Sequence, residues 1–120
     1  MKRLTVLLSL IAVVMPFTSG AAQVDISALK QKAAVGDPAA QIQLGMTYAL
    51  AVPRDSQQAM KWYLMAAQQG RPEAQYKVGS LYEQGLGVPQ NKSSAIAWYT
   101  KSSQQGYPDA RDALKALEEQ

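Results

Sequence analysis

The chain repeats itself at an interval of about 35 residues, and this limits its possible folds more than any other feature. The segment Gly-Asp-Pro-Ala-Ala-Gln at 36–41 returns as Gly-Arg-Pro-Glu-Ala-Gln at 70–75, and more weakly as Gly-Tyr-Pro-Asp-Ala-Arg at 106–111. Further along, the pattern of Leu44, Gly45 and Tyr48 returns at Val78, Gly79 and Tyr82, and that of Ala59, Trp62 and Tyr63 returns at Ala95, Trp98 and Tyr99. Such periods are typical of stacked helical units, each of which buries its apolar face only against its neighbours. Arrays of this kind mostly present a surface to a partner.

The N-terminus, residues 1–22, has the order of a secretory signal peptide. Lys2 and Arg3 precede an apolar run at 4–14, which a proline ends before small residues lead to Ala22. The run is short against the roughly 20 residues that span a bilayer, so a membrane anchor is the less favoured alternative. We expect cleavage after Ala22 or Ala21 and export to the periplasm or the medium, with no membrane insertion after cleavage.

Charge and cysteine content exclude several classes of protein. The chain has a formal net charge of +3, and removal of Lys2 and Arg3 leaves the mature protein close to neutral. Nucleic-acid binding needs basic side chains gathered on one face, so we expect none. Because cysteine is absent, no disulfide can brace the domain, and helix packing must provide its stability.

Apolar periodicity and capping residues predict the helices and their grouping. Asp37, Asp55 and Asn91 are suitable N-caps, Pro38 suits a first helical position, and Gly70 is a suitable stop. The expected helices cover 25–35, 38–49, 56–69, 72–84, 92–105 and 108–118. They divide the mature chain into an N-terminal cap helix (23–35), a first repeat (36–69), a second repeat (70–105) and a C-terminal capping helix (106–120).

Small and aromatic residues recur together along these helices. Ala40, Gly45, Ala74 and Gly79 would let helix axes approach closely, which leaves aromatic side chains of the second helices to fill the space between units. We therefore assign Trp62, Tyr63, Trp98 and Tyr99 to the core. A stacking platform for carbohydrate or bases is the less favoured alternative.

These motifs together resemble the Sel1-like repeat, a member of the tetratricopeptide-type class. The likeness covers 36–106 as two units, with a partial third unit to about Leu114. Repeat one lacks the Gly-x-Gly loop that repeat two has at Gly85 and Gly87, and repeat two has serines at 102 and 103 where repeat one has alanines. The resemblance implies an all-α fold: a right-handed helix-hairpin solenoid of two Sel1-like repeats with flanking cap helices.

The resemblance also implies protein–protein interaction, with exported members acting as adaptors, inhibitors or regulators of envelope proteins. By analogy with the class, the first helix of each unit would line a concave face that takes up a peptide or helix. The candidate partner-binding residues are Ile42, Met46, Leu50, Glu73, Tyr76, Ser80, Glu83 and Asp112. This face would be apolar at one end and acidic at the other, which suits a segment with hydrophobic and basic side chains. Alternatively, Ile42, Met46 and Leu50 pack on the helix at 25–35 or on another copy of the chain, so self-association stays open.

The absence of histidine and cysteine excludes several kinds of enzyme active site. Without histidine and cysteine, histidine-based triads, thiol nucleophiles and the usual zinc ligand sets are excluded. Ser27 and Lys30 match a Ser-x-x-Lys spacing, but the companion motifs of that enzyme class are absent. We expect no enzyme, cofactor or metal. The alternative is a weak cell-wall hydrolase or peptidoglycan-ligand binder that uses Glu73, Glu83, Asp109 or Asp112.

Overall fold

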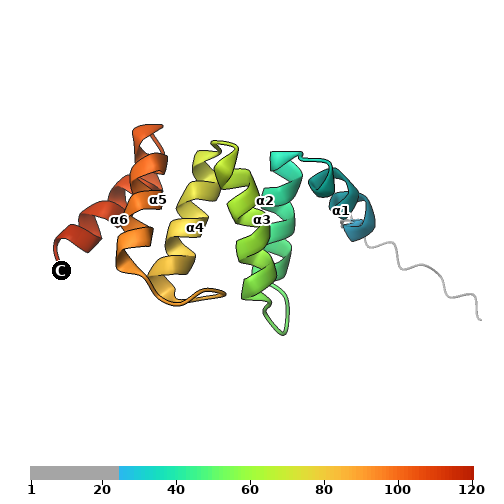
Figure 1. The fold of residues 1–120 in the computed structure, drawn as a ribbon, viewed down its shortest axis with the longest axis horizontal. Coiled ribbons are helices and arrows are strands. Elements are labelled where there is room, and N and C mark those ends of the chain that lie inside the picture. The colour runs from blue at the N-terminus through green and yellow to red at the C-terminus, as the bar shows by residue number, and fades with distance from the viewer. Residues whose placement is uncertain (1–24) are drawn as a thin grey trace, which may run out of the picture.

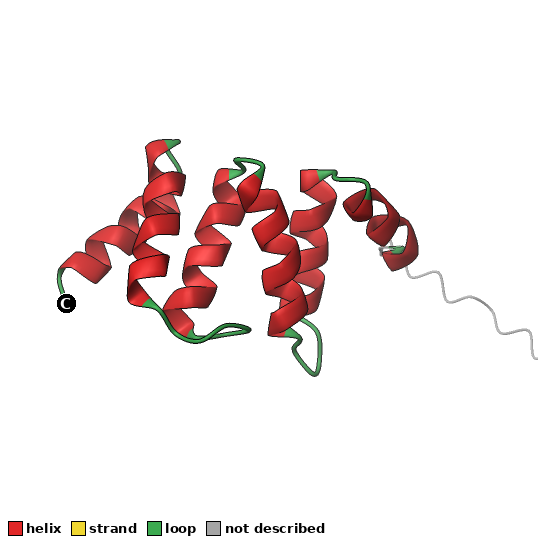
Figure 2. Cartoon of the chain, in the orientation of Figure 1, coloured by secondary structure: helices red, strands yellow, loops and turns green. Residues whose placement is uncertain are grey.

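The computed structural model describes residues 25–120, and within this range the chain forms helices and no strands (Figure 2). The helices are α1 (Ile26–Ala34), α2 (Pro38–Ala49), α3 (Ser56–Gln68), α4 (Pro72–Gln84), α5 (Lys92–Gln104) and α6 (Pro108–Glu118). Each expected helix is confirmed to within one residue at either end. The predicted signal peptide lies outside the described residues.

The helices form a solenoid in which chain neighbours are also spatial neighbours. The strongest helix–helix contacts join α1 to α2, α2 to α3, and so on to α6. Figure 1 shows the hairpins α2–α3 and α4–α5 side by side, with α1 and α6 at the two ends. The short connections after α1, α3 and α5 lie along one edge, and the longer α2–α3 and α4–α5 loops lie along the opposite edge (Figure 1). Within residues 25–120, no helix combines the length and apolar character needed to cross a bilayer.

Helix starts follow the capping residues read from the sequence. The side chains of Asp37, Asp55 and Asn91 each accept a hydrogen bond of 3.0 Å from a backbone N–H in the first turn of the next helix. Such bonds satisfy N–H groups that have no partner within the helix. Arg71 and Tyr107 stand before α4 and α6 without a side-chain cap, and both helices instead begin with proline, whose fixed φ suits a first helical position.

The short connections share one turn geometry. Gly36, Gly70 and Gly106 have φ values of 101°, 93° and 85°, a region that other residues seldom adopt. The residue after each glycine donates its N–H back to a carbonyl near the end of the preceding helix, at 3.1 to 3.3 Å. The repeated glycine therefore fixes the angle at which each first helix departs.

The core consists of three clusters, and each cluster joins different helices. Leu29, Ala33, Ala40 and Leu44 join α1 to α2; a second cluster joins α2, α3 and α4; a third joins α5 to α6. Tyr63 and Tyr99 are fully buried, as predicted. Trp62 and Trp98 are half-buried; Trp62 packs on the α1–α2 cluster and Trp98 on the cluster that joins α2, α3 and α4. Because the clusters cross unit boundaries, the units bury their apolar faces against one another.

The two helix glycines allow the close approach that the sequence predicts. A Cβ atom added at Gly45 would lie 2.7 Å from the ring of Tyr63, and one at Gly79 would lie 2.7 Å from the ring of Tyr99. Real Cβ atoms do not come so near. Each glycine therefore provides the space that a buried tyrosine of the following helix occupies.

Buried glutamines link successive units. Gln41 and Gln75, 1% and 5% exposed, donate through Nε2 to the carbonyls of Ala33 and Ala67, at 3.0 and 3.2 Å. Their Oε1 atoms accept from the Nε2 atoms of Gln69 and Gln105, at 2.8 and 2.9 Å. We call this pattern the glutamine ladder. It satisfies buried polar groups at the same place in both units, as buried polar groups require.

Ser102, which stands where the first repeat has an alanine, is packed as tightly as that alanine. Ser102 is fully buried, and its Oγ donates to the carbonyl of Pro72 at 2.7 Å. The α4–α5 loop also fits closely, because a Cβ at Gly87 would lie 2.3 Å from the carbonyl oxygen of Ser56. Gly87 thus lets this loop rest on the start of α3 in the preceding unit.

Candidate functional site

The exposed side of the first helices carries an apolar groove between α2 and α4. Met46 is 38% exposed and Leu50 is 75% exposed, although both are large apolar side chains. They line a cavity of about 160 Å³ together with Ala49, Tyr63, Lys77, Ser80 and Leu81. A neighbouring hollow of about 240 Å³ is lined by Gln43, Met46, Thr47 and Leu50. We call the first of these hollows, whose wall includes residues of α4, the α2–α4 groove; it brings together three of the predicted residues, Met46, Leu50 and Ser80.

Ile42 does not contribute to this exposed surface, so its predicted place there is wrong. It is 8% exposed and belongs to the cluster that joins α2, α3 and α4. It does not pack in the α1–α2 cluster either, which contains Leu29 and Leu44 instead. The physical reason is that α2 is covered on two sides: one buries Ala40 and Leu44 against α1, and the other buries Ile42 against α3 and α4.

Three tyrosines meet where α4, α5 and the start of α6 come together. The ring centroid of Tyr76 lies 5.6 Å from that of Tyr99 and 5.5 Å from that of Tyr107, with interplanar angles of 34° and 47°. Tyr99 is buried, whereas Tyr76 and Tyr107 are half-exposed. The hydroxyl of Tyr99 donates to Oε2 of Glu83 at 2.5 Å. We call this group the tyrosine cluster; two predicted residues, Tyr76 and Glu83, belong to it or touch it.

Carboxylates surround the tyrosine cluster and affect its titration. Burial, then the charges of Asp109 and Glu83, raise the pKa of Tyr76 above its ordinary value. Burial, then Glu73 and Asp109, raise the pKa of Tyr107. Burial and the hydrogen bond to Glu83 raise the pKa of Tyr99 as well. The phenols therefore stay protonated at neutral pH and offer ring faces and hydroxyl donors.

The pKa of Tyr63, a buried tyrosine of the first unit, is raised as well. Burial raises the pKa of Tyr63 to about 12, and the charge of Glu73 adds to the effect. Glu73, in the first turn of α4, thus raises the pKa of Tyr63 in the first repeat and of Tyr107 at the start of the C-terminal cap. Asp112, the last predicted residue, is exposed on α6, one turn beyond Asp109. The predicted set is therefore divided: the α2–α4 groove and the tyrosine cluster hold most of it, Ile42 is in the core, Glu73 lies in the first turn of α4, and Asp112 is exposed on α6.

Sequence reasoning missed two residues of this surface. Tyr107 occupies the position held by Asp37 and Arg71 in the other units; an aromatic residue there cannot cap the helix, and this was the available signal of a packing role. Lys77 lines the α2–α4 groove, and its Nζ lies 5.9 Å from the ring centroid of Tyr76. No repeat pattern marks Lys77, because the equivalent residue of the first unit is Gln43.

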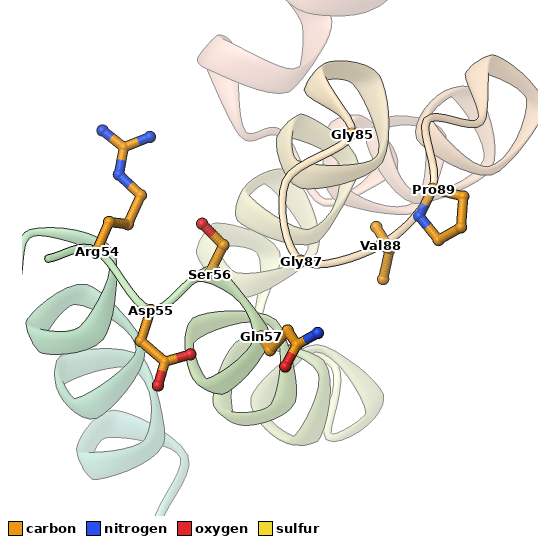
Figure 3. A pocket seen from close by; sticks show the side chains of 8 residues that line it. All are labelled: Arg54, Asp55, Ser56, Gln57, Gly85, Gly87, Val88 and Pro89. Atoms are coloured by element: carbon orange, nitrogen blue, oxygen red, sulfur yellow. The ribbon is translucent and has the colours of Figure 1, made fainter.

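A further, open hollow of about 530 Å³ lies between the loops of the two units (Figure 3). It is lined by Arg54, Asp55, Ser56, Gln57, Gly85, Gly87, Val88 and Pro89. Asp55 already caps α3, and Figure 3 shows the side chain of Arg54 pointing away from Gly87. In the part of the chain that the structure describes, no three carboxylates gather as a metal ion would require. This hollow is a junction of loops, and its lining residues do not form a ligand-binding site.

Comparison with known proteins agrees with the repeated architecture. The sequence pattern of the Sel1 repeat matches residues 38–70 and 72–107. The crystal structure of a Sel1 repeat protein from Oxalobacter formigenes is similar at 38% sequence identity and a TM-score of 0.72, over 76% of this chain and 70% of that one. A second similar structure is c5321, a protective antigen present in uropathogenic Escherichia coli strains that displays an SLR fold. It is 39% identical with a TM-score of 0.74, over 79% of this chain and 21% of that one. No curated protein matches the chain.

Proposed function

The chain belongs to the Sel1 repeat family, whose members are generally non-catalytic protein–protein interaction modules, and on this premise we propose that it binds a segment of an envelope protein. The binding surface is the exposed side of α2, α4 and α6. Its role is that of an adaptor, inhibitor or regulator, and it acts after export.

The α2–α4 groove is the observation that supports this proposal. A partner could cover Met46 and Leu50, and burial of apolar surface is the main favourable contribution to most protein association. The groove is flanked by polar groups: Lys77 lines it, and Ser80 accepts a hydrogen bond of 2.7 Å from Gln84. An apolar centre with a polar rim is the usual anatomy of a protein interface.

Export is proposed from the N-terminal sequence alone. Lys2 and Arg3, the apolar run and the small residues before Gln23 have the order of a cleaved signal. N-terminal sequencing of the protein purified from its source cells checks this point. We expect the mature chain to begin at Gln23 or Ala22, and an intact Met1 or Lys2 would contradict export by this route.

Site-specific cross-linking tests the binding surface. A photoreactive amino acid at Leu50 should capture a specific protein when cells that produce the full chain are irradiated. The matched control is Val52, which is 99% exposed but lies in the α2–α3 loop outside the groove. The adduct from position 50 should disappear with Met46→Glu, because a buried carboxylate without a partner is costly. The same adducts from both positions, or an adduct that persists with Met46→Glu, would refute the proposal.

A further inference from the structure

The tyrosine cluster offers two open aromatic surfaces next to the α2–α4 groove. Tyr99 is 1% exposed and forms the floor, while the half-exposed Tyr76 and Tyr107 meet above it at a centroid distance of 5.5 Å. Ser80, which lines the groove, lies one helical turn from Tyr76 on the same side of α4. A bound segment that fills the groove therefore reaches the cluster along α4.

The charges around the cluster favour a cation. The carboxyl of Glu83 is held against it by the hydroxyl of Tyr99, and a carboxylate that accepts one hydrogen bond still has room for others. The negative charge of Asp109 raises the pKa of both Tyr76 and Tyr107, and that of Glu73 raises the pKa of Tyr107. The faces of aromatic rings are themselves negative, so rings and carboxylates attract the same kind of group.

A positive side chain of the protein already approaches this place. Nζ of Lys77 lies 5.9 Å from the ring centroid of Tyr76, near the outer limit of a cation–π contact. Lys77 balances only part of the charge of Glu73, Glu83 and Asp109. It also lines the groove, so its flexible side chain can move aside when a partner arrives.

We infer that the tyrosine cluster receives an arginine side chain of the partner segment whose apolar side chain fills the α2–α4 groove. This inference rests on the proposed function and specifies the partner as an amphipathic, basic segment. Arginine fits better than lysine because its planar guanidinium stacks on aromatic rings and pairs with a carboxylate through two parallel hydrogen bonds. Tyr76 and Tyr107 supply the rings, and Glu83 and Asp109 supply the carboxylates.

Peptide selection provides a probe that needs no known partner. The full chain is used to select binders from a displayed library of helix-forming random peptides, and the Met46→Glu chain removes those that bind elsewhere. Selected peptides should carry arginine beside apolar residues. Replacing that arginine by citrulline, which keeps the shape and loses the charge, should weaken binding by about tenfold or more. Replacement by lysine should have a smaller effect.

Variants of the protein test whether the arginine of the peptide binds at the tyrosine cluster. Asp109→Asn and Glu83→Gln should each weaken binding of the arginine peptide and leave binding of the citrulline peptide nearly unchanged. Glu118→Gln is the matched control, since it removes the same charge from an exposed position half a turn around α6 from Asp109. Circular dichroism of each variant confirms that it is folded before its affinity is compared.

The outcomes separate the inference from the function on which it rests. Peptides that need Met46 but bind equally well with citrulline would overturn the arginine inference and leave the proposed function standing. Equal losses with Asp109→Asn and Glu118→Gln would also overturn it, because they would indicate general charge attraction. A selection without any peptide that needs Met46 would count against both.

Discussion

Two glycines, one in the first helix of each hairpin, set the distance to the second helix. Gly45 and Gly79 both face the ring of a buried tyrosine at 2.7 Å from where a Cβ would be. At Gly79 an added Cβ would also lie 3.2 Å from backbone, the carbonyl oxygen of Ala95. A side-chain ring can shift by a few tenths of an ångström more easily than a helix backbone can.

Gly79→Ala should therefore destabilise the protein, because its methyl group would press on a buried ring and on the backbone of α5. Alanine favours the helix by about 1 kcal/mol over glycine, but overpacking a core costs about 1–3 kcal/mol. We expect Gly79→Ala to lower the free energy of unfolding by up to about 2 kcal/mol, measured by urea denaturation. Ser93→Ala, at an exposed position of α5, is the control for helix propensity. A stability gain with Gly79→Ala would contradict the packing described here.

Pairing of these small residues with tyrosines could be predicted from the sequence because both recur with the same period. The burial of Tyr63 and Tyr99 follows from that repetition. Ile42 was misplaced because helical spacing gives the direction of a side chain but not how many neighbours surround its helix. Tyr107 was missed because its contacts with Tyr76 join residues of different units, where no local pattern marks them.

Between elements, the glutamine ladder connects the end of each second helix to the first helix of its own unit. Gln69 bonds to Gln41 in repeat one, and Gln105 bonds to Gln75 in repeat two. In the third, partial unit the equivalent position is Arg111, which is exposed, so the ladder stops at α6. The recurrence of glutamine was visible in the sequence, but its bonding partners were not, because each bond depends on how two helices are placed.

A double-mutant cycle measures the second bond of the ladder. Gln75→Ala should lower the free energy of unfolding by about 1–3 kcal/mol because it removes two hydrogen bonds, one to the carbonyl of Ala67 and one from Nε2 of Gln105. Both groups keep a second partner in the Gly70 backbone. Gln105→Ala should cost less, and the two changes should couple by about 0.5–1.5 kcal/mol. The control pair uses Gln104→Ala, an exposed neighbour in the last turn of α5, which should be additive with Gln75→Ala. Additivity of the Gln75 and Gln105 changes would show that the bond contributes nothing.

At the scale of the whole molecule, the apolar clusters lie between units, and the exposed side of α2, α4 and α6 is what remains for a partner. Ala74, Val78 and Leu81 of α4 complete the cluster that begins with Ile42 on α2 and includes Met60 and Tyr63 on α3. The helix ranges and the all-α solenoid could be read from the repeat, because caps and turn glycines recur at each unit. The sequence did not predict that tyrosines and carboxylates meet at one end of the solenoid, because this depends on the placement of α6.

The dependence of one unit on the next can be measured with the fragment 25–70, which ends after α3. This fragment lacks Ala74, Val78 and Leu81, the part that α4 contributes to the cluster joining α2, α3 and α4. Far-UV circular dichroism during urea titration should show a single cooperative transition for residues 25–120. The fragment should have clearly lower helix content per residue and no cooperative transition, because small pieces with an incomplete core are marginal at best. A fragment with full helicity that unfolds cooperatively on its own would contradict the central claim that the units complete one another's core.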